Sequence, residues 1–492
     1  YSKKPGKEQG HGGPIDKKNS GGYNKRYGSL RAGRSGGNDM QKETVRDMTT
    51  GSPAKHILFF SIPLLVGNVL QQLYNMVDSW TVGNFTGDTA LAAVGVAFPV
   101  VFLFVSLFIG LGIGSTVIIA QFYGAGEMER VRAAVDTAYA AFLIIAIPVS
   151  LIGVATAGPI LHLMQVDAAA FPEAKLYLQL VSLGLVGSIG YNTNAGILQG
   201  LGDSKTPLFF LSIATVINIV LDILFVAVFR WGVAGVAFAT IIAEWFSWIF
   251  GMIWINRKYD AFHLRLYKLK LDRRLLYQIV RIGLPAGIQN GLIAVAIMAL
   301  TTKVNTYEYD FTAGFNVGNK IDCFAFLPVQ SFANAVTTFV GQNVGAGKME
   351  RVYAGVRSTL WMSILWCAAA AALVIPLAGP IMRLFSQTDA VVAAGVLYLD
   401  WVMPFYALFA ILFVLNNAMR GAGDAVFPMV SSLISVVVVR VGLCYLLAYL
   451  FGPDYMFACY AGGWIVGAVL STVYYRMGRW KRFGSVAESE GQ

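Results

Sequence analysis

Uninterrupted apolar runs constrain this chain more than any other feature of it. Two of them read HILFFSIPLLVGNVLQQLYNMV, from residue 56, and AAFLIIAIPVSLIGVAT, from residue 140. Such runs approach or reach the roughly 20 residues that cross a bilayer, and without water their backbone groups must be satisfied within a helix. Only 13% of the residues are charged, about half the fraction usual in soluble domains. The chain is therefore predicted to be an all-α polytopic membrane protein.

About twelve spans are predicted, six in each half of the chain. Their centres lie near residues 70, 107, 146, 187, 217 and 244, and near 290, 327, 366, 407, 437 and 467. A repeat supports this division, because QFYGAGEMERV at 121–131 matches QNVGAGKMERV at 342–352 in eight of eleven positions, 221 residues further on. The same offset relates QGLGDSKTPL at 199–208 to RGAGDAVFPM at 420–429. Two homologous six-helix lobes are expected, an arrangement known from transporters.

The first repeated motif is interpreted as a turn between two helices. Gly124 and Gly126, with their counterparts Gly345 and Gly347, permit a tight turn after a helix. The MERV residues that follow are expected to start the next helix. A conformational role without chemistry is the simpler interpretation of these four glycines.

Basic residues predict the orientation of the spans. Beyond residue 39, twenty-two Lys and Arg fall in loops or termini on one side, and only Lys175, Arg230, Lys303 and Arg383 fall on the other. Cytoplasmic loops carry the excess of positive charge in membrane proteins. Both termini, the loop at 256–281 and the duplicated turn are therefore expected on the cytoplasmic side of the cell membrane.

The predicted domain organisation begins with a basic tail. Residues 1–39 contain nine Lys or Arg against three Asp or Glu and too few large apolar side chains to fold. We expect a disordered tail at 1–51, with the working protein starting near Met40 or Met48. The other predicted ranges are an N-lobe at 52–256, an inter-lobe loop at 257–281, a C-lobe at 282–482 and a C-terminal tail at 483–492.

Ionisable side chains inside spans are costly and by default mark a functional site. The spans of the first half contain three acids and no base: Asp78, Asp222 and Glu244. Helical spacing places further polar residues on the faces of these acids, namely Asn68, Gln71, Gln72 and Asn75, then Thr215 and Asn218, then Thr240 and Ser247. These stripes predict a hydrated, cation-binding cavity. The alternative is that they join helices by hydrogen bonds.

The spans of the second half hold acids and bases together. Lys320 and Asp322 share one span, and Arg440 lies on another. Residues two apart do not face each other on a helix, so Lys320 and Asp322 are expected to pair elsewhere. A structural or gating role is favoured for these charges, with a second coupling site as the alternative.

Taken together, the motifs resemble those of the multidrug and toxic compound extrusion (MATE) family of antiporters. The resemblance runs from about residue 52 to residue 482 and includes IPLLVGN, NMVDSWTVG, GQNVGAGK, LQGLGDSKTP and INIVLD. It implies a MATE-like fold and a cation-coupling site. The family positions of that site correspond here to Asp78, Asn218, Asp222 and Thr240, and a kink proline corresponds to Pro63.

Two further coupling residues are weaker matches. Asn194 lies one position out of register with the family's fourth-helix Asn, and Glu244 is assigned from its place in a span alone. A substrate cavity is expected to include Gln71, Asn75, Met76 and Tyr406, because aromatic rings and thioethers suit flat organic cations.

The leading hypothesis is a secondary active antiporter that exports organic cations or drugs in exchange for Na⁺ or H⁺. The alternative is a lipid-linked precursor flippase of the same superfamily, which would favour a strongly basic cavity. An enzyme is not expected, because no HExxH motif or nucleophile–base pair stands out. Neither a metal site nor a cofactor beyond the coupling ion is expected, since Cys and His are scattered. The expected partners are small organic cations and the bilayer, not nucleic acid, with one copy sufficient for function.

Overall fold

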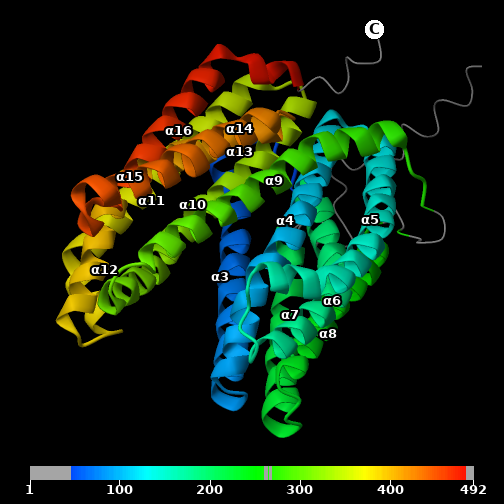
Figure 1. Cartoon of the computed structure of the whole chain (residues 1–492). Helices are drawn as coiled ribbons and strands as arrows, with labels where there is room; N and C mark the ends of the chain where they lie inside the picture. The colour runs from blue at the N-terminus through cyan, green and yellow to red at the C-terminus, as the bar shows by residue number, and fades with distance from the viewer. Residues whose placement is uncertain (1–45, 260–263, 265–268, 484–492) are drawn as a thin grey trace, which may run out of the picture. The chain divides into compact units, whose positions relative to one another are not determined.

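The described part of the chain is helical throughout. The computed structural model describes residues 46–259, 264 and 269–483 (Figure 1). The first half contains α3 (Pro53–Phe85), α4 (Asp88–Ala125), α5 (Met128–Leu163), α6 (Phe171–Gly200), α7 (Lys205–Asp222), η2 (Ile223–Val228) and α8 (Val233–Lys258). The second half contains α9 (Arg273–Val304), α10 (Tyr309–Gly345), α11 (Met349–Arg383), α12 (Asp389–Val402), η3 (Met403–Phe405), α13 (Tyr406–Gly421), α14 (Val426–Ser432), η4 (Leu433–Val441), α15 (Gly442–Phe451), η5 (Pro453–Tyr455), α16 (Ala458–Met477) and η6 (Arg479–Phe483).

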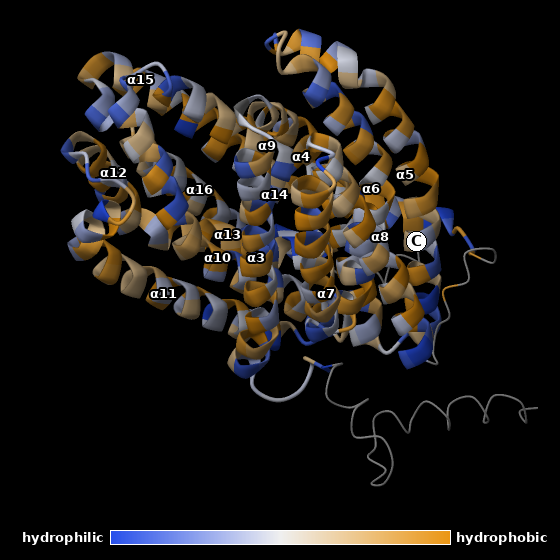
Figure 2. Ribbon diagram, turned by 90° about the horizontal axis from the view of Figure 1, so that it is seen from below, coloured by the Kyte–Doolittle hydropathy of each residue, from blue (hydrophilic) through white to orange (hydrophobic). Residues whose placement is uncertain are grey.

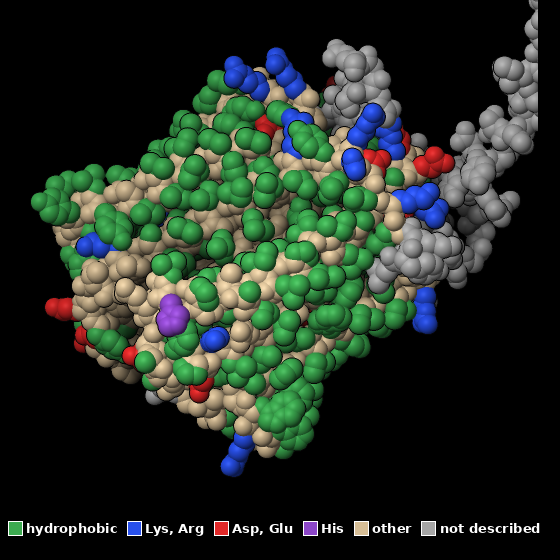
Figure 3. Space-filling model, turned by 45° about the vertical axis from the view of Figure 1, so that its right-hand side comes forward, with side chains coloured by type: hydrophobic (Ala, Val, Ile, Leu, Met, Phe, Trp, Pro, Cys, Tyr) green, Lys and Arg blue, Asp and Glu red, His purple; other side chains and the backbone are tan. Residues whose placement is uncertain are grey.

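The helices have the length and composition of membrane spans. Within the described residues, eleven helical segments are long and apolar enough to cross a bilayer. The thirty-residue helix α6 is the twelfth long segment, and its Ser, Thr and Asn residues lower its hydropathy. Hydrophobic residues dominate the helices in Figure 2, and on the face seen in Figure 3 most Lys and Arg gather at one end. All twelve predicted span centres fall within these segments, and the all-α polytopic fold class is confirmed.

The first helix of each half packs against the other half as well as against its own. Helix α9, which opens the second half, packs along α4 of the first, and α3, which opens the first half, packs along α10 of the second. Within the first half, α6 lies against α4, α5 and α8. The repeat therefore relates both the helices and their contacts. Pro63 lies inside α3 as predicted, where it removes one backbone hydrogen bond.

Two glutamines, each the first residue of a motif copy, join the halves. The side-chain amide of Gln121 donates to the carbonyl of Gly421 at 3.1 Å, and that of Gln342 donates to the carbonyl of Gly200 at 3.2 Å. Both glutamines are at most 2% exposed. Since 221 residues separate both the donors and the acceptors, the two bonds obey the sequence repeat. We call this meeting point of the halves the junction.

The four motif glycines have two different tasks. Gly126 and Gly347 end their helices at φ 79° and 70°, a left-handed conformation that favours glycine, so they make the predicted turn. Gly124 and Gly345 lie at the junction, where a Cβ on either would overlap the backbone of Gln342 or Gln121. The close approach of the two halves requires glycine at both positions. The sequence had predicted only a turn for them.

Gly126→Val is expected to impair folding or the conformational cycle while leaving substrate affinity in detergent unchanged. The left-handed conformation costs a non-glycine residue roughly 1–2 kcal/mol, and the turn lies outside the spans. Cation binding to purified protein and transport in liposomes measure the two effects separately. Gly379→Val is the matched control, because no atom lies within 4 Å of a Cβ built there. Loss of affinity in a well-folded Gly126→Val protein would contradict this interpretation.

The end of the predicted tail is packed against the core. Met48 is fully buried, and its backbone N–H donates to the side chain of Gln342 at 3.0 Å. Arg351 donates to the carbonyls of Met48, Thr50 and Gly51 at 2.8–3.0 Å. Residues 46–51 are thus ordered, contrary to the prediction of a disordered tail through residue 51, because this segment supplies carbonyls to the second motif copy. Residues 1–45 and 484–492 lie outside the described part.

The predicted inter-lobe loop is shorter than its range of 257–281. Helix α8 continues to Lys258, and α9 begins at Arg273. Asp272 caps α9 by accepting from the backbone N–H of Arg274 at 2.8 Å, which offsets one of the unpaired donors of a helix start. Residues 260–263 and 265–268 of this loop lie outside the described part.

Candidate functional site

Two acids predicted from the sequence meet between α3 and α7. The side-chain amide of Asn218 is oriented with its nitrogen toward the two carboxyl groups. This nitrogen donates to Asp78 at 3.1 Å and to Asp222 at 3.2 Å. The two carboxyl groups also lie within hydrogen-bonding reach of each other. We call Asp78, Asn218 and Asp222 the acidic cluster.

Local helix geometry explains this meeting. Thr215, Asn218 and Asp222 are spaced three and four residues apart, so they share one face of α7, and all three are buried. The α-helical geometry ends at Asp222, where the π-helical segment η2 begins, and such segments often occur at functional sites. Helix α3 packs along α7 and brings Asp78 to this face.

Residues of α6 and α8 surround the acidic cluster. The hydroxyl of Tyr74 donates to that of Thr240 at 3.0 Å, which links α3 to α8. Glu244 accepts a hydrogen bond from Ser188, and Tyr177 lies near enough to be influenced by the charges of Asp78, Asp222 and Glu244. The structure therefore gathers the three acids predicted within the spans of the first half, together with Thr240, in one region.

The acidic cluster can hold a single small cation or a proton. One carboxyl oxygen of Asp222 has no hydrogen-bond partner among the described residues, and an unmatched buried charge is costly. Two carboxyl groups side by side disfavour ionisation of both. In the described part of the chain, no three Asp, Glu, His or Cys side chains converge as ligands of a metal ion.

Other predicted residues lie elsewhere. Asn194 is fully buried, where its amide donates to the carbonyl of Trp248 at 2.9 Å and accepts from the hydroxyl of Tyr139. These bonds tie α6 to α5 and α8 and do not join Asn194 to the acidic cluster. Gln71 is exposed, Asn75 is half-buried, and Met76 is 61% exposed on α3.

Tyr406, which was predicted to line a substrate cavity, does not lie in a cavity in this structure, and its role in substrate binding stays a prediction. Its side chain is 2% exposed and belongs to the apolar core of the second half. Its hydroxyl donates to the carboxyl group of Asp322, which also accepts from Tyr398 at 3.0 Å. A carboxylate that is partly removed from water requires such donors, and Asp322 thereby holds the hydroxyl of Tyr406 in the core.

The charged residues of the second half are held by their own neighbours. Lys320 is exposed and Asp322 is bound by the two tyrosines, so the two charges face apart, as their spacing predicts. Arg440 lies 4.0 Å from the centre of the Tyr460 ring and near enough for its charge to act on Asp322. These contacts support a structural role for Asp322 and Arg440, whereas the role of Lys320 stays a prediction.

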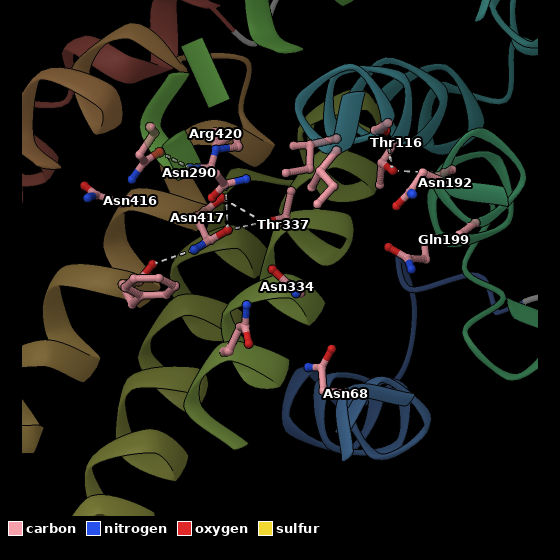
Figure 4. Close-up of a pocket in the computed structure, with 18 of the residues that line it drawn as sticks. Asn68, Thr116, Asn192, Gln199, Asn290, Asn334, Thr337, Asn416, Asn417 and Arg420 are labelled. Carbon is pink, nitrogen blue, oxygen red and sulfur yellow. Dashed lines mark hydrogen bonds between the residues drawn. The ribbon is translucent and has the colours of Figure 1, made fainter. Parts of the chain in front are cut away.

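A cavity of about 300 Å³ lies between the halves (Figure 4). Nineteen residues line it, nine of them Asn or Gln, and the only charged side chain among the nineteen is Arg420. Asn68 and Gln199 come from the first half, and their counterparts at the 221-residue offset, Gln289 and Arg420, come from the second. The cavity therefore lies where the repeat brings equivalent helices together.

Most residues of this cavity were not predicted from the sequence. Only Asn68 belonged to a predicted stripe, and Tyr177 was not identified beside the acidic cluster. A signal existed, because Gln199 and Arg420 are the first residues of QGLGDSKTPL and RGAGDAVFPM. Position by position comparison of the repeats would have shown that a charge replaces an amide there.

Among the described residues, twelve long helical segments in two repeated halves, with a cavity between the halves and a pair of linked carboxyl groups in the first, define a multi-pass membrane transporter. The family model MatE matches this chain twice, at residues 63–224 and 285–446. The chain therefore belongs to the MATE family of multidrug efflux transporters, whose members are transporters and not enzymes.

Individual relatives agree with this assignment. The chain is 30% identical to the Probable multidrug resistance protein YpnP of Bacillus subtilis, over 88% of this chain and 97% of that protein. It is 29% identical to the Probable multidrug resistance protein YoeA of the same organism, over 79% of this chain and 86% of that protein. The fold matches a solved outward-facing multidrug resistance MATE transporter of the MOP superfamily with a TM-score of 0.83 at 23% identity, covering 90% and 99% of the two chains.

Proposed function

We propose that this protein is a secondary active antiporter of the cell membrane that exports organic cations in exchange for Na⁺ or H⁺. The observation that carries the proposal is the acidic cluster, in which Asn218 links the carboxyl groups of Asp78 and Asp222. Such a cluster favours one bound positive charge, which either a coupling ion or a cationic substrate can supply.

Exchange follows if the two cations compete for the same negative charge. Asp222 is fully buried, and no Lys or Arg of the described residues forms an ion pair with either aspartate. A proton or Na⁺ entering down its gradient would neutralise the pair and favour the state that has released the substrate. Carboxyl oxygens suit Na⁺, which is a hard cation, and two close carboxyl groups suit a proton equally well.

The orientation follows from the basic end of the molecule. With that end and both termini in the cytoplasm, the junction between Gln121 and Gln342 closes the cytoplasmic side. In this conformation any opening would then face the outside. A single copy contains both halves and is proposed to be the functional unit.

The flippase alternative is less well supported. A site for pyrophosphate would require several basic groups, whereas one of the nineteen residues around the inter-lobe cavity is basic. The first half contributes buried acids rather than bases.

Gradient-driven efflux from proteoliposomes tests the proposal. A fluorescent organic cation inside the vesicles is expected to leave when a Na⁺ or proton gradient is imposed in the opposite direction, and to stay without one. Ionophores that collapse each gradient separately identify the coupling ion. Efflux that is equally fast without any gradient would contradict the proposed antiport.

A further inference from the structure

Arg420 is a buried base in the wall of the inter-lobe cavity. It lies at the end of α13 and is 5% exposed. One terminal nitrogen donates to the side-chain oxygen of Asn417 at 3.1 Å, and the other donates to that of Gln289. Figure 4 shows its guanidinium beside Asn417 and Asn290.

The guanidinium of Arg420 has an N–H donor that forms no hydrogen bond with the described residues. A guanidinium carries five N–H groups. Arg420 uses two of its nitrogens for the hydrogen bonds to Asn417 and Gln289. The Nε of Arg420 is buried and has no hydrogen-bond partner among the described residues. Burial of such a group without a partner costs roughly 1–3 kcal/mol, and more when the group is charged.

The guanidinium also has no ion-pair partner in the part of the chain that the structure describes. The ion pairs of the described residues join Arg130 to Glu127, Lys258 to Asp203 and Arg383 to Asp389, and none involves Arg420. None of the nineteen described residues that line the cavity is Asp or Glu. Arg420 lies in the last turn of α13, where a buried charge without a partner is costly, and the group that would satisfy it is an anion.

The rest of the cavity suits a polar ligand. Amides from both halves, such as Asn68, Gln199 and Asn334, can donate and accept hydrogen bonds. The volume of about 300 Å³ is at the lower end of small-molecule sites. The first half contributes neutral Gln199 at the position equivalent to Arg420 of the second half. The positive charge of the cavity wall therefore comes from the second half.

We propose that the inter-lobe cavity is an oxyanion subsite in which Arg420 binds the carboxylate or phosphate group of a small organic substrate. Guanidinium groups bind both anions through paired N–H donors. The inference rests on the proposed export function and narrows its substrates: favoured molecules carry an oxyanion in addition to the cationic group that competes at the acidic cluster.

Equilibrium binding to the purified protein tests this subsite without requiring transport. The probes are a fluorescent fluoroquinolone, which carries an amine and a carboxylate, and its methyl ester, which retains the amine. Wild-type protein is expected to bind the carboxylate form roughly tenfold more tightly, as one hydrogen-bonded charge pair provides. Arg420→Gln is expected to remove this preference, and Arg420→Lys to retain part of it. Competition by benzoate or by phenyl phosphate shows which oxyanion is preferred.

The controls separate a binding role from a structural one. Glutamine is the residue at the repeat-related position 199, so Arg420→Gln introduces a side chain that this fold already accommodates, and thermal unfolding checks that it is folded. Arg383→Gln removes an exposed base outside the cavity and is expected to leave the preference intact. An undiminished preference in folded Arg420→Gln, or no preference in wild type, would overturn the proposal. Failure of gradient-driven efflux with the preference intact would instead count against the proposed antiport.

Discussion

Asp222→Asn is expected to abolish ion-driven efflux, reducing the rate to that of protein-free liposomes. The side chain is fully buried, and one of its oxygens has no partner among the described residues. Asparagine keeps the size of the side chain but cannot carry the negative charge that attracts a cation. Because the proposed exchange depends on that charge, no coupling ion or cationic substrate would be held at the acidic cluster. Efflux of a fluorescent cation under an imposed gradient measures the loss.

The matched comparisons for this prediction lie in both halves. Asp78→Asn is expected to have the same effect, since Asn218 links the two carboxyl groups. Asp322→Asn is expected to leave partial activity, because an amide oxygen can still accept from Tyr398 or Tyr406. Transport by Asp222→Asn at the wild-type rate and with the wild-type ion dependence would remove the acidic cluster from the mechanism.

Gly124→Val is expected to prevent the junction from closing and to slow transport at least tenfold. A side chain at this position would overlap the backbone of Gln342 in the opposite half. Overpacking of this kind costs roughly 1–3 kcal/mol, and each 1.4 kcal/mol changes a population about tenfold. The cost falls only on conformations in which the halves meet, so the alternation between states is disturbed while each half can still fold.

Spin labels measure this effect directly. Arg132 on α5 and Arg357 on α11 are exposed positions in opposite halves, and cysteines there can be labelled in a background without the four native cysteines. Gly124→Val is expected to lengthen the label–label distance relative to wild type. Gly95→Val on the same helix is the control, because nothing lies within 4 Å of a Cβ built there. Wild-type distances together with wild-type transport would refute the role assigned to Gly124.

Helical periodicity predicted the acidic cluster because its residues obey a local rule. Asn218 and Asp222 lie four residues apart, so any helix places them on one face. The partner helix that brings Asp78 to them came from the family resemblance and from the rarity of acids in spans. The twelve segments and their repeat could be predicted for a similar reason, since apolar length and internal identity are both visible in the sequence.

Features that depend on tertiary contacts could not be predicted in this way. Tyr406 was expected in a cavity because of its aromatic ring, yet the carboxylate of Asp322 holds its hydroxyl. Gly124 was interpreted as part of a turn, although the opposite half determines why a glycine is needed there. Arg420 is the first residue of RGAGDAVFPM, and Gln199 is the first residue of the matching QGLGDSKTPL. The shared residues of these motifs revealed the repeat, but the difference at the first position identifies the buried charge.

Displacement of the coupling ion by the substrate tests the central claim most directly. Purified wild-type protein is mixed with a saturating organic cation, while proton release in weakly buffered solution and displacement of bound ²²Na⁺ are recorded. Because binding linkage is reciprocal, we predict release of about one coupling ion per substrate bound, and none from the Asp78→Asn/Asp222→Asn double variant. Substrate binding by the wild-type protein without release of either ion would contradict competition at the acidic cluster.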